Sequence, residues 1–300
     1  EVGLACDHAR LACNSIKGRG DVSYCVYDEM LREKLRKQQY VVDHIDEALE
    51  KEFVKVFYQP VMRVKTGKIC GYEALVRWED PNMGFLSPAD FIETLEHFHL
   101  IHKVDEYVVE KVCKEYARLK KEGEPIVPTS VNLSRLDFEL CDIYSVIENL
   151  RKKYDVPIEY LDLEITESAL NENDRHLKEE CVRFHESGYR LWLDDFGSGY
   201  SSLNVLTEFE FDVLKMDLVF LRNIDHNEKT KVLMSYIADG ARRLGMEPLT
   251  EGVETEEHYE FLKSIDCERA QGFYFGKPQL MDETRAYTKG KGYEWESFEL

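Results

Sequence analysis

The chain has 300 residues, of which 59 are acidic and 39 are Lys or Arg, so its formal net charge is −20. This charge makes the chain a poor candidate for binding long nucleic acid, because such binding needs a basic surface that neutralises many phosphates. The eight cysteines are scattered without CxxC spacing, which is typical of reduced thiols and not of a disulfide framework or a zinc site.

No apolar run approaches the roughly 18 residues that a membrane span requires. The first residues, EVGLACDHARLAC, also lack the pattern of a secretory signal peptide. We therefore expect a soluble cytoplasmic chain that makes no membrane contact and has no polymeric nucleic-acid partner.

Residues 29–52 form the first long predicted helix. They combine helix-forming residues and dense charge of both signs with apolar side chains at helical spacing, among them Leu31, Leu35, Val42 and Leu49. Such a helix either caps the body of the protein or connects it to a preceding segment, and the pattern is compatible with both.

From residue 53 onward, short strand-like runs alternate with amphipathic helical stretches. The predicted strands are residues 53–59, 68–78, 126–133, 160–166, 189–195, 211–217, 246–251 and 269–275, and the helical stretches include 88–122 and 138–154. Eight strands interleaved with helices indicate the α/β class and, within it, a TIM-like (β/α)8 barrel.

The connection between the first two strands departs from this pattern. Only RVKTGK (63–68) separates them, whereas a parallel crossover needs a dozen or more residues. The segment is favourable for a hairpin because Gly67 can adopt a positive φ. We therefore expect an antiparallel first strand in an otherwise parallel barrel.

Polar side chains recur at the carboxyl ends of the predicted strands, where barrel enzymes carry their active sites. They are Glu73, Asn132, Glu164, Asp194, Asp195, Lys215, Glu251 and Gln271. One acidic residue at a strand end is usually a helix cap or a solvated rim residue, but a set of polar residues that recurs on seven strands indicates a site. So many carboxylates cannot all stay ionised at one mouth without cations.

The ligand types at this mouth predict which cations it binds. Oxygen ligands without His or Cys favour Mg²⁺ or Mn²⁺ over zinc. The adjacent carboxylates of Asp194 and Asp195 favour two ions, because one carboxylate can bridge both ions while its neighbour binds the second. A pair of divalent ions is suited to the hydrolysis of a phosphodiester.

The heptad YEALVRW (72–78) resembles the signature of the EAL domain family, the cyclic-di-GMP-specific phosphodiesterases. Further blocks of that family occur in order: YQP (58–60), SPADFI (87–92), SVNLS (130–134), LEITES (163–168), DDFGSGYSSL (194–203), LKMD (214–217), EGVET (251–255) and QGFYFGKP (271–278). The resemblance covers about residues 50–280, and DDFGSGYSSL is highly specific on its own. It implies a metal-dependent enzyme that hydrolyses cyclic di-GMP to linear pGpG in bacterial second-messenger signalling.

The resemblance also implies roles for individual residues. The residues matching ligands of two Mg²⁺ or Mn²⁺ ions are Glu73, Asn132, Glu164 and Asp194 for the first ion and Asp194, Asp195 and Glu251 for the second. The residues matching the catalytic set are Lys215, which positions the attacking water, Glu251, a general-base candidate, and the supporting Glu73 and Gln271. Arg77 matches a contact to a ligand phosphate, Gln59 and Asp217 match further substrate-binding positions, and Glu167 matches a residue that steadies the loop 196–202.

The ends of the chain complete the predicted organisation. ACDHARLACNSIKGRGDVSYCVYD (5–28) resembles the last helix and strand of a GGDEF domain. We therefore expect a GGDEF remnant at 1–28, a connecting helix at 29–52, the EAL barrel at 53–282 and a C-terminal extension at 283–300. The resemblance further implies a homodimer and an upstream GGDEF domain in the full-length protein, whose own membrane anchoring stays open.

Two alternative functions remain compatible with the sequence. A receptor that binds cyclic di-GMP without cutting it would be favoured by the loss of a predicted site residue, and none is lost. A barrel hydrolase for another phosphodiester, such as linear pGpG, would differ in its turnover of cyclic and linear substrates. Phe273 and Tyr274 lie near Gln271, and one of them could stack on a guanine while strand alternation sends the other into the core.

Overall fold

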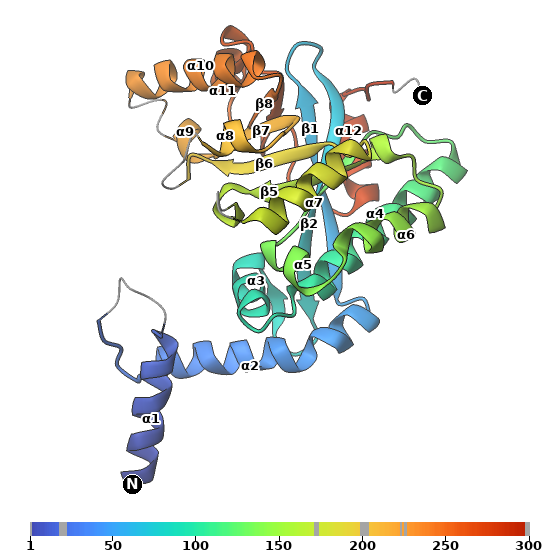
Figure 1. The fold of residues 1–300 in the computed structure, drawn as a ribbon. Helices are drawn as coiled ribbons and strands as arrows, with labels where there is room; N and C mark the ends of the chain where they lie inside the picture. Colours follow the sequence, from blue (N-terminus) through green and yellow to red (C-terminus); the bar gives the residue numbers. More distant parts are fainter. Residues whose placement is uncertain are drawn as a thin grey trace.

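Eight strands close a barrel in the computed structural model, which describes residues 2–17, 23–170, 174–198, 204–222, 224 and 227–297 (Figure 1). The barrel strands are β1 (Val54–Arg63), β2 (Lys68–Asp80), β4 (Thr129–Asn132), β5 (Leu161–Thr166), β6 (Leu191–Phe196), β7 (Val213–Met216), β8 (Glu247–Thr250) and β9 (Arg269–Gln271), and a short further strand, β3 (Gly84–Leu86), lies beside β2. Their hydrogen-bonded order is β1-β9-β8-β7-β6-β5-β4-β2, closed by the pairing of β1 with β2. The predicted barrel is therefore confirmed.

The first strand of the barrel runs against its neighbours. β1 pairs antiparallel with both β2 and β9. All the other neighbouring strands of the barrel, from the pair β2–β4 to the pair β8–β9, are parallel. The turn between β1 and β2 has Gly67 at a φ of 66°, and its N–H donates to the carbonyl of Arg63. The predicted antiparallel first strand is thus confirmed, while the short β3, which pairs with β2 outside the ring, was not predicted.

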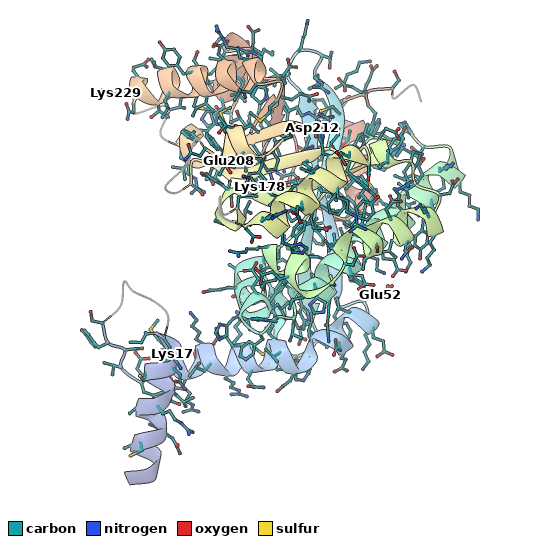
Figure 2. The ribbon with its side chains drawn as sticks, viewed as in Figure 1. Lys17, Glu52, Lys178, Glu208, Asp212 and Lys229 are labelled. Atoms are coloured by element: carbon teal, nitrogen blue, oxygen red, sulfur yellow. The ribbon has the colours of Figure 1, made fainter. Side chains whose placement is uncertain are left out.

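The α-helices of the described residues are α1 (Val2–Ser15), α2 (Glu29–Glu50), α3 (Pro88–His97), α4 (Ile101–Glu122), α5 (Arg135–Leu140), α6 (Ile143–Lys153), α7 (Arg175–Glu186), α8 (Val205–Glu208), α9 (Val219–Arg222), α10 (Glu228–Arg243), α11 (Glu256–Ser264) and α12 (Met281–Lys291). Those from α3 onward surround the barrel wall (Figure 1). Neighbouring helices are also joined at the surface, as by the ion pair between Lys178 of α7 and Glu208 of α8 (Figure 2). Among the described residues, no helix has the length and apolar character needed to cross a membrane.

Three predicted elements differ in extent from the structure: two predicted helices are each divided in two, and one predicted strand ends early. The stretch 88–122 is divided between α3 and α4, because His99 takes a left-handed φ of 58° while the apolar periodicity continues on both sides. The stretch 138–154 is likewise divided, since Asp142 caps a new helix by accepting from the N–H of Ser145. The last predicted strand stops at Gln271, where Gly272 begins a turn closed by hydrogen bonds from Phe275 and Gly276.

The predicted helix at 29–52 forms as α2 and packs against the barrel. Lys37 Nζ lies 2.5 Å from the carboxylate of Asp90, and Tyr40 donates to Asp80 at 2.9 Å. These contacts fasten α2 to α3 and to the end of β2, so α2 caps the body. In Figure 1, α1 projects away from the barrel. No strand forms within residues 23–28, where the resemblance to a GGDEF domain predicted one.

The barrel interior has three layers. At the amino end of the parallel strands, Glu247 accepts from Arg269 at 2.5 Å and pairs with Arg63 at 3.0 Å. A small apolar layer lies above them and consists of Val61, Cys70, Trp192, Val213 and Leu249. The third layer, at the carboxyl ends of the strands, is polar and forms the candidate site.

The C-terminal extension is packed against the amino end of the barrel. Ile69 and residues 294–296 exchange two backbone hydrogen bonds of 2.8 Å, and Trp295 Nε1 donates to Tyr72 Oη at 2.7 Å. Arg63 adds a bond of 3.2 Å to Glu296. Residues 294–296 are therefore a structural part of the barrel base.

Candidate active site

Strand alternation and register bring the predicted polar residues together at one end of the barrel. Gln59 lies opposite Glu73 in the β1–β2 pair, and Asn132 lies opposite Glu164 in the β4–β5 pair. Because residues of paired strands at the same register point to the same side, these four side chains all face the barrel interior. Asp194, Lys215 and Gln271 follow the same alternation on β6, β7 and β9.

Lys215 is the centre of this arrangement. Its ammonium contacts the carboxylates of Glu73 at 3.1 Å, Glu164 at 2.8 Å, Asp194 at 3.2 Å and Glu251 at 2.8 Å. Lys215 is 1 % exposed and Glu164 is fully buried, so water screens this cluster poorly. One ammonium faces four carboxyl groups, which leaves an excess of negative charge if all are ionised.

A glutamine and an asparagine orient the carboxylate of Glu73, and a second glutamine supports the first. Asn132 donates to its Oε1 at 3.2 Å, and Gln271 donates to its Oε2 at 2.5 Å. The same amide of Gln271 lies 3.0 Å from Gln59 Oε1, and Gln59 in turn donates to the carbonyl of Gly276. The side chain of Glu73 is therefore held by amides from β4 and β9, with Gln59 of β1 next to the amide from β9.

Burial and repulsion change the proton affinities of the clustered carboxyl groups. Burial, with repulsion from Glu73, holds the pKa of Glu164 well above its ordinary value. Burial likewise raises the pKa of Glu251 to about 7, against the opposing attraction of Lys215. For Glu73 burial acts in the same direction, but Lys215 and the amide donors outweigh it and lower the pKa. Such unequal pKa values are typical of neighbouring carboxyl groups whose negative charge exceeds the positive charge beside them.

Asp195 lies beside the cluster without contacting Lys215. Its backbone has a left-handed φ of 57°, and its N–H donates to Asp194 Oδ1 at 2.8 Å. Burial and repulsion from Asp194 raise the pKa of Asp195 to about 6. The strain of a non-glycine residue in this region is often found where a side chain is aimed for function.

Two further predicted residues hold the turns that follow β6 and β7. Glu167 accepts from the N–H of Gly197 at 3.2 Å. Gly197 has a φ of 92°, and a Cβ there would lie 2.4 Å from the ring of Phe220, so only glycine fits. Asp217 accepts from the N–H of Val219 at 2.6 Å and thereby shapes the turn after β7. Residues 199–202 of the predicted loop lie outside the described residues.

Arg77 lies on the same face of β2 as Glu73, four residues further along the strand. Its Nη1 donates to the carbonyl of Val76 at 2.7 Å, and its guanidinium lies 5.8 Å from the ring centre of Phe57. Within the described part of the chain, no hydrogen bond or ion pair joins it to the carboxylates around Lys215, although the charge of Glu73 acts on it. The half-buried guanidinium is thus positioned at the mouth next to the cluster and outside it.

The ligand types in the cluster fit divalent cations, although in this structure the carboxylates contact the ammonium of Lys215. Among the described residues, no group of three or more Asp, Glu, His or Cys is arranged to hold a metal ion as it stands. The carboxylates converge on the ammonium because it is the nearest counter-charge. Glu164 Oε1 nevertheless has no hydrogen-bond partner within the described part of the chain. An unpaired buried oxygen, excess negative charge and carboxylate and amide ligands fit Mg²⁺ or Mn²⁺.

Two cavities flank the cluster on opposite sides of the barrel mouth. The larger, of about 490 Å³, opens beside Asn132 near the ends of β2, β4 and β5. The smaller, of about 160 Å³, opens beside Glu251 and Gln271 near the ends of β8 and β9. In the strand order of the barrel these two groups of strands are separated by β6 and β7 on one side and by β1 on the other.

Two acidic residues at the larger cavity were not predicted from the sequence. Asp105 of α4 lines the cavity, and the neighbouring Asp137 of α5 is fully buried. Burial and the Asp137 carboxyl hold the pKa of Asp105 well above its ordinary value, and burial raises that of Asp137 to about 6. The sequence does contain a sign of Asp105, because helical spacing places it on the same face as the buried Val104, Val108 and Val109.

The comparisons with known proteins place the chain in one family. The sequence model of the EAL domain matches residues 42–278, which include the C-terminal part of α2 and all nine strands. The chain belongs to the EAL domain family. The predicted family resemblance is thereby confirmed.

Individual relatives share the whole barrel. The chain is 31% identical over 271 residues to the cyclic di-GMP phosphodiesterase PdeR of Escherichia coli K12, covering 90% of this chain and 41% of PdeR. It is 30% identical over 280 residues to the bifunctional diguanylate cyclase/cyclic di-GMP phosphodiesterase MucR of Pseudomonas aeruginosa, covering 93% of this chain and 41% of MucR. The chain thus spans about two-fifths of the length of these curated relatives.

A solved structure matches the fold along nearly its whole length. The structure of the PaMucR phosphodiesterase in complex with c-di-GMP superposes with a TM-score of 0.76 at 30% identity. The match covers 81% of this chain and 99% of that one.

Proposed function

We propose that this chain is a phosphodiesterase that hydrolyses cyclic di-GMP to linear pGpG with the help of Mg²⁺ or Mn²⁺. The observation that carries the proposal is the convergence of Glu73, Glu164, Asp194 and Glu251 on Lys215 at the barrel mouth. Membership of the EAL domain family and the activity named for PdeR and MucR support the same substrate.

The candidate metal ligands follow from the resemblance of the strand-end residues to those of the EAL domain family. Two divalent ions would be held by Glu73, Asn132, Glu164, Asp194, Asp195 and Glu251. When bound, such ions polarise a phosphate and lower the pKa of a water molecule towards neutrality. Asn132 and Gln271 hold Glu73 in position for this role through their bonds to its two oxygens.

The remaining side chains supply positioning and charge. The ammonium of Lys215 is a compact donor that can orient the attacking water and offset charge developing on the phosphate. Glu251 Oε1 is the candidate acceptor for the proton of that water. Arg77 would bind a phosphate of the ligand, with Gln59 and Asp217 as further contacts on the substrate side. Glu167 would steady the loop that follows Asp195 through its bond to Gly197.

The two cavities suit a ligand with two similar halves. Cyclic di-GMP has two guanosines joined by two phosphates, so a phosphate at the cluster places one base on each side of it. Cavities of about 490 Å³ and 160 Å³ lie on these two sides. Sites of this kind combine apolar walls with a few polar groups that fix the orientation of the ligand.

Assembly and context are part of the same proposal. We infer that the chain acts as a homodimer and that residues 1–28 are the end of an upstream GGDEF domain. MucR, a longer relative, is a bifunctional diguanylate cyclase/cyclic di-GMP phosphodiesterase, and this supports the second inference. A monomeric mass in light scattering at micromolar concentration would contradict the dimer.

Incubation of the chain with cyclic di-GMP and Mg²⁺ or Mn²⁺, followed by chromatography, tests the proposal. We expect conversion to pGpG that stops when a chelator is added, and faster turnover of the cyclic than of the linear substrate. Binding without conversion under both metals would favour a cyclic di-GMP receptor. Faster turnover of pGpG would indicate a hydrolase for linear dinucleotides.

A further inference from the structure

The turn that follows β4 connects Asn132, a candidate metal ligand, to the beginning of α5. Within this turn the N–H of Leu133 donates to the carbonyl of Glu164 at 2.9 Å. Ser134 is the N-cap of α5, and its hydroxyl donates to Glu96 of α3 at 2.9 Å. The position of the Asn132 side chain therefore depends on how firmly this turn is held by the elements around it.

Asp137 fixes the beginning of α5 with one of its two carboxyl oxygens. Its Oδ2 accepts from the N–H of Ser134 at 2.8 Å, and the N–H of Asp137 donates back to the carbonyl of Ser134 at 3.0 Å. The other oxygen, Oδ1, is buried and has no hydrogen-bond donor in the described part of the chain if every carboxyl group is ionised. A buried acceptor without a donor costs free energy, so Oδ1 indicates that a neighbouring group carries a proton.

The carboxyl group of Asp105 is the neighbour that can supply this proton. Asp105 lies on α4, and its side chain is within hydrogen-bonding range of the Asp137 carboxyl group. Asp105 is 8 % exposed and Asp137 is fully buried, so water solvates neither group well. Two ionised carboxylates in contact repel each other, and a buried pair of this kind retains one proton over a wide range of pH. With that proton, one carboxyl group donates to the other and satisfies the buried oxygen.

The charges around this pair favour keeping the proton on it. Titratable and charged residues on the surrounding elements are Glu96 of α3, His102 and Glu106 of α4, Arg135 of α5, Cys141 directly after α5 and His176 of α7. Glu96 repels both carboxyl groups. Arg135 is already paired with Glu139 and Asp174, at 3.0 Å each. A carboxyl group in such negative surroundings is stabilised in its protonated form.

We propose that Asp105 and Asp137 share one proton and act as positioning residues for Asn132, by fastening the turn after β4 to α4. The capping box joins Asp137 to the turn, and the shared proton joins Asp137 to α4. Asn132 in turn donates to Glu73 Oε1 at 3.2 Å, so the pair acts on the carboxylate cluster through that amide. The inference rests on the proposed function, because it gives the pair a role through a candidate metal ligand.

The shared proton is tested by the pH dependence of stability. Burial and the Asp137 carboxyl hold the folded-state pKa of Asp105 above its unfolded value, so the wild type loses stability as the pH rises between the two values. Asp105→Asn keeps a donor that does not titrate, and it should escape this loss. Urea unfolding should therefore show the folded-to-unfolded ratio of the variant, relative to the wild type, rising by about tenfold from pH 6.5 to pH 7.5. Glu106→Gln, an exposed neighbour on α4, should show no such rise.

Binding of Mn²⁺, followed by electron paramagnetic resonance, tests the positioning role. Asp105→Leu removes the hydrogen bond while keeping a side chain of similar size. Loss of a residue that supports a metal ligand typically weakens metal binding by about 10- to 100-fold, and for this indirect contact we expect the lower end of that range. Asp105→Asn, which keeps the hydrogen bond, should bind Mn²⁺ with the wild-type affinity.

The outcomes separate this inference from the proposed function. If Asp105→Asn changed stability equally at pH 6.5 and at pH 7.5, the shared proton would be overturned. Unchanged Mn²⁺ affinity of Asp105→Leu, or of the smaller Asp105→Ala if the leucine variant does not fold, would overturn the positioning role alone. A wild-type chain that binds no Mn²⁺ and leaves cyclic di-GMP intact would overturn the proposed function together with the positioning role.

Discussion

The ammonium of Lys215 lies 2.8 Å from Oε2 of Glu164, and both side chains are almost completely removed from solvent. Glu164 sits on β5 and Lys215 on β7, so the contact crosses the interior of the barrel. Buried charges of this kind are stable only when they are paired. Lys215 is therefore the internal counter-ion of the carboxylate cluster as well as the candidate for positioning water.

Replacing Lys215 by methionine should destabilise the chain in the absence of metal. The change leaves four clustered carboxyl groups without their ammonium, and breaking a buried ion pair typically costs about 3–5 kcal/mol. Thermal unfolding in the presence of a chelator measures the loss, and Lys229→Met, on the exposed start of α10, serves as the control. Addition of Mn²⁺ should recover part of the stability but not the hydrolysis. Equal melting temperatures of the Lys215 variant and the wild type would contradict this role.

Divalent ions should stabilise the wild-type chain. A ligand present at about 100 times its Kd and bound only to the folded state adds roughly 2.7 kcal/mol. For a chain of this size such a gain corresponds to a rise of about 5 °C or more in Tm. Glu73→Gln removes one ligand charge and should reduce the rise, which differential scanning fluorimetry with Mg²⁺, Mn²⁺ or chelator can follow. If divalent ions raised the Tm of both proteins equally, the ions would bind away from Glu73.

Acid should selectively weaken the barrel base at Glu247. Burial opposes ionisation there, but Arg269, Arg190 and Arg63 outweigh it and lower the pKa from 4.5 to about 2. A folded-state pKa below the unfolded value means that the group contributes stability above about pH 4.5 and loses it as the pH falls towards 2. Glu247→Gln should therefore be less stable than the wild type at pH 7.

The pH dependence of this difference is the discriminating observation. Urea unfolding of the wild type and of Glu247→Gln at pH 7 and pH 3.5 should show a difference in the free energy of unfolding that is smaller at the lower pH. Glu228→Gln alters a carboxylate whose side chain is 84% exposed and should change stability little at either pH. If Glu247→Gln lowered the free energy of unfolding equally at pH 7 and at pH 3.5, its effect would not come from the ion pairs of Glu247.

The C-terminal extension should be coupled to β2 through Trp295 and Tyr72. Trp295 Nε1 donates to Tyr72 Oη at 2.7 Å, and a net contribution of about 1 kcal/mol is usual for such a bond. Trp295→Phe and Tyr72→Phe should each destabilise the chain by roughly that amount. The double variant should cost less than the sum of the two, as expected for partners in one bond. Strictly additive losses in urea unfolding would show that the two side chains contribute separately.

The polar residues at the barrel mouth could be located from the sequence because two simple rules place them. Strand alternation gives the inward-facing positions, and parallel pairing brings the carboxyl ends of neighbouring strands to one level. Glu73, Glu164 and Asp194 follow from these rules without knowledge of any other contact. The antiparallel β1 followed from the short link around Gly67.

Other features depend on contacts that the local pattern does not contain. The closure of four carboxylates on Lys215 depends on side-chain directions across the barrel. The interaction of Asp105 with Asp137 joins α4 to α5 and does not follow from the pattern of either helix alone. The break at His99 is hidden because the apolar periodicity continues through it. The packing of Trp295 on Tyr72 joins residues more than two hundred positions apart.

Hydrolysis of cyclic di-GMP in ¹⁸O-labelled water tests the central claim most directly. Attack of water on one phosphorus atom and departure of the 3′ oxygen give pGpG with one labelled oxygen on its 5′ phosphate. Mass spectrometry of wild-type reactions with Mn²⁺ should show this singly labelled product, and Glu73→Gln should form it at least about 100-fold more slowly. Unlabelled product, or no product from a chain that binds the dinucleotide in the presence of Mg²⁺ and of Mn²⁺, would contradict a phosphodiesterase acting through this cluster.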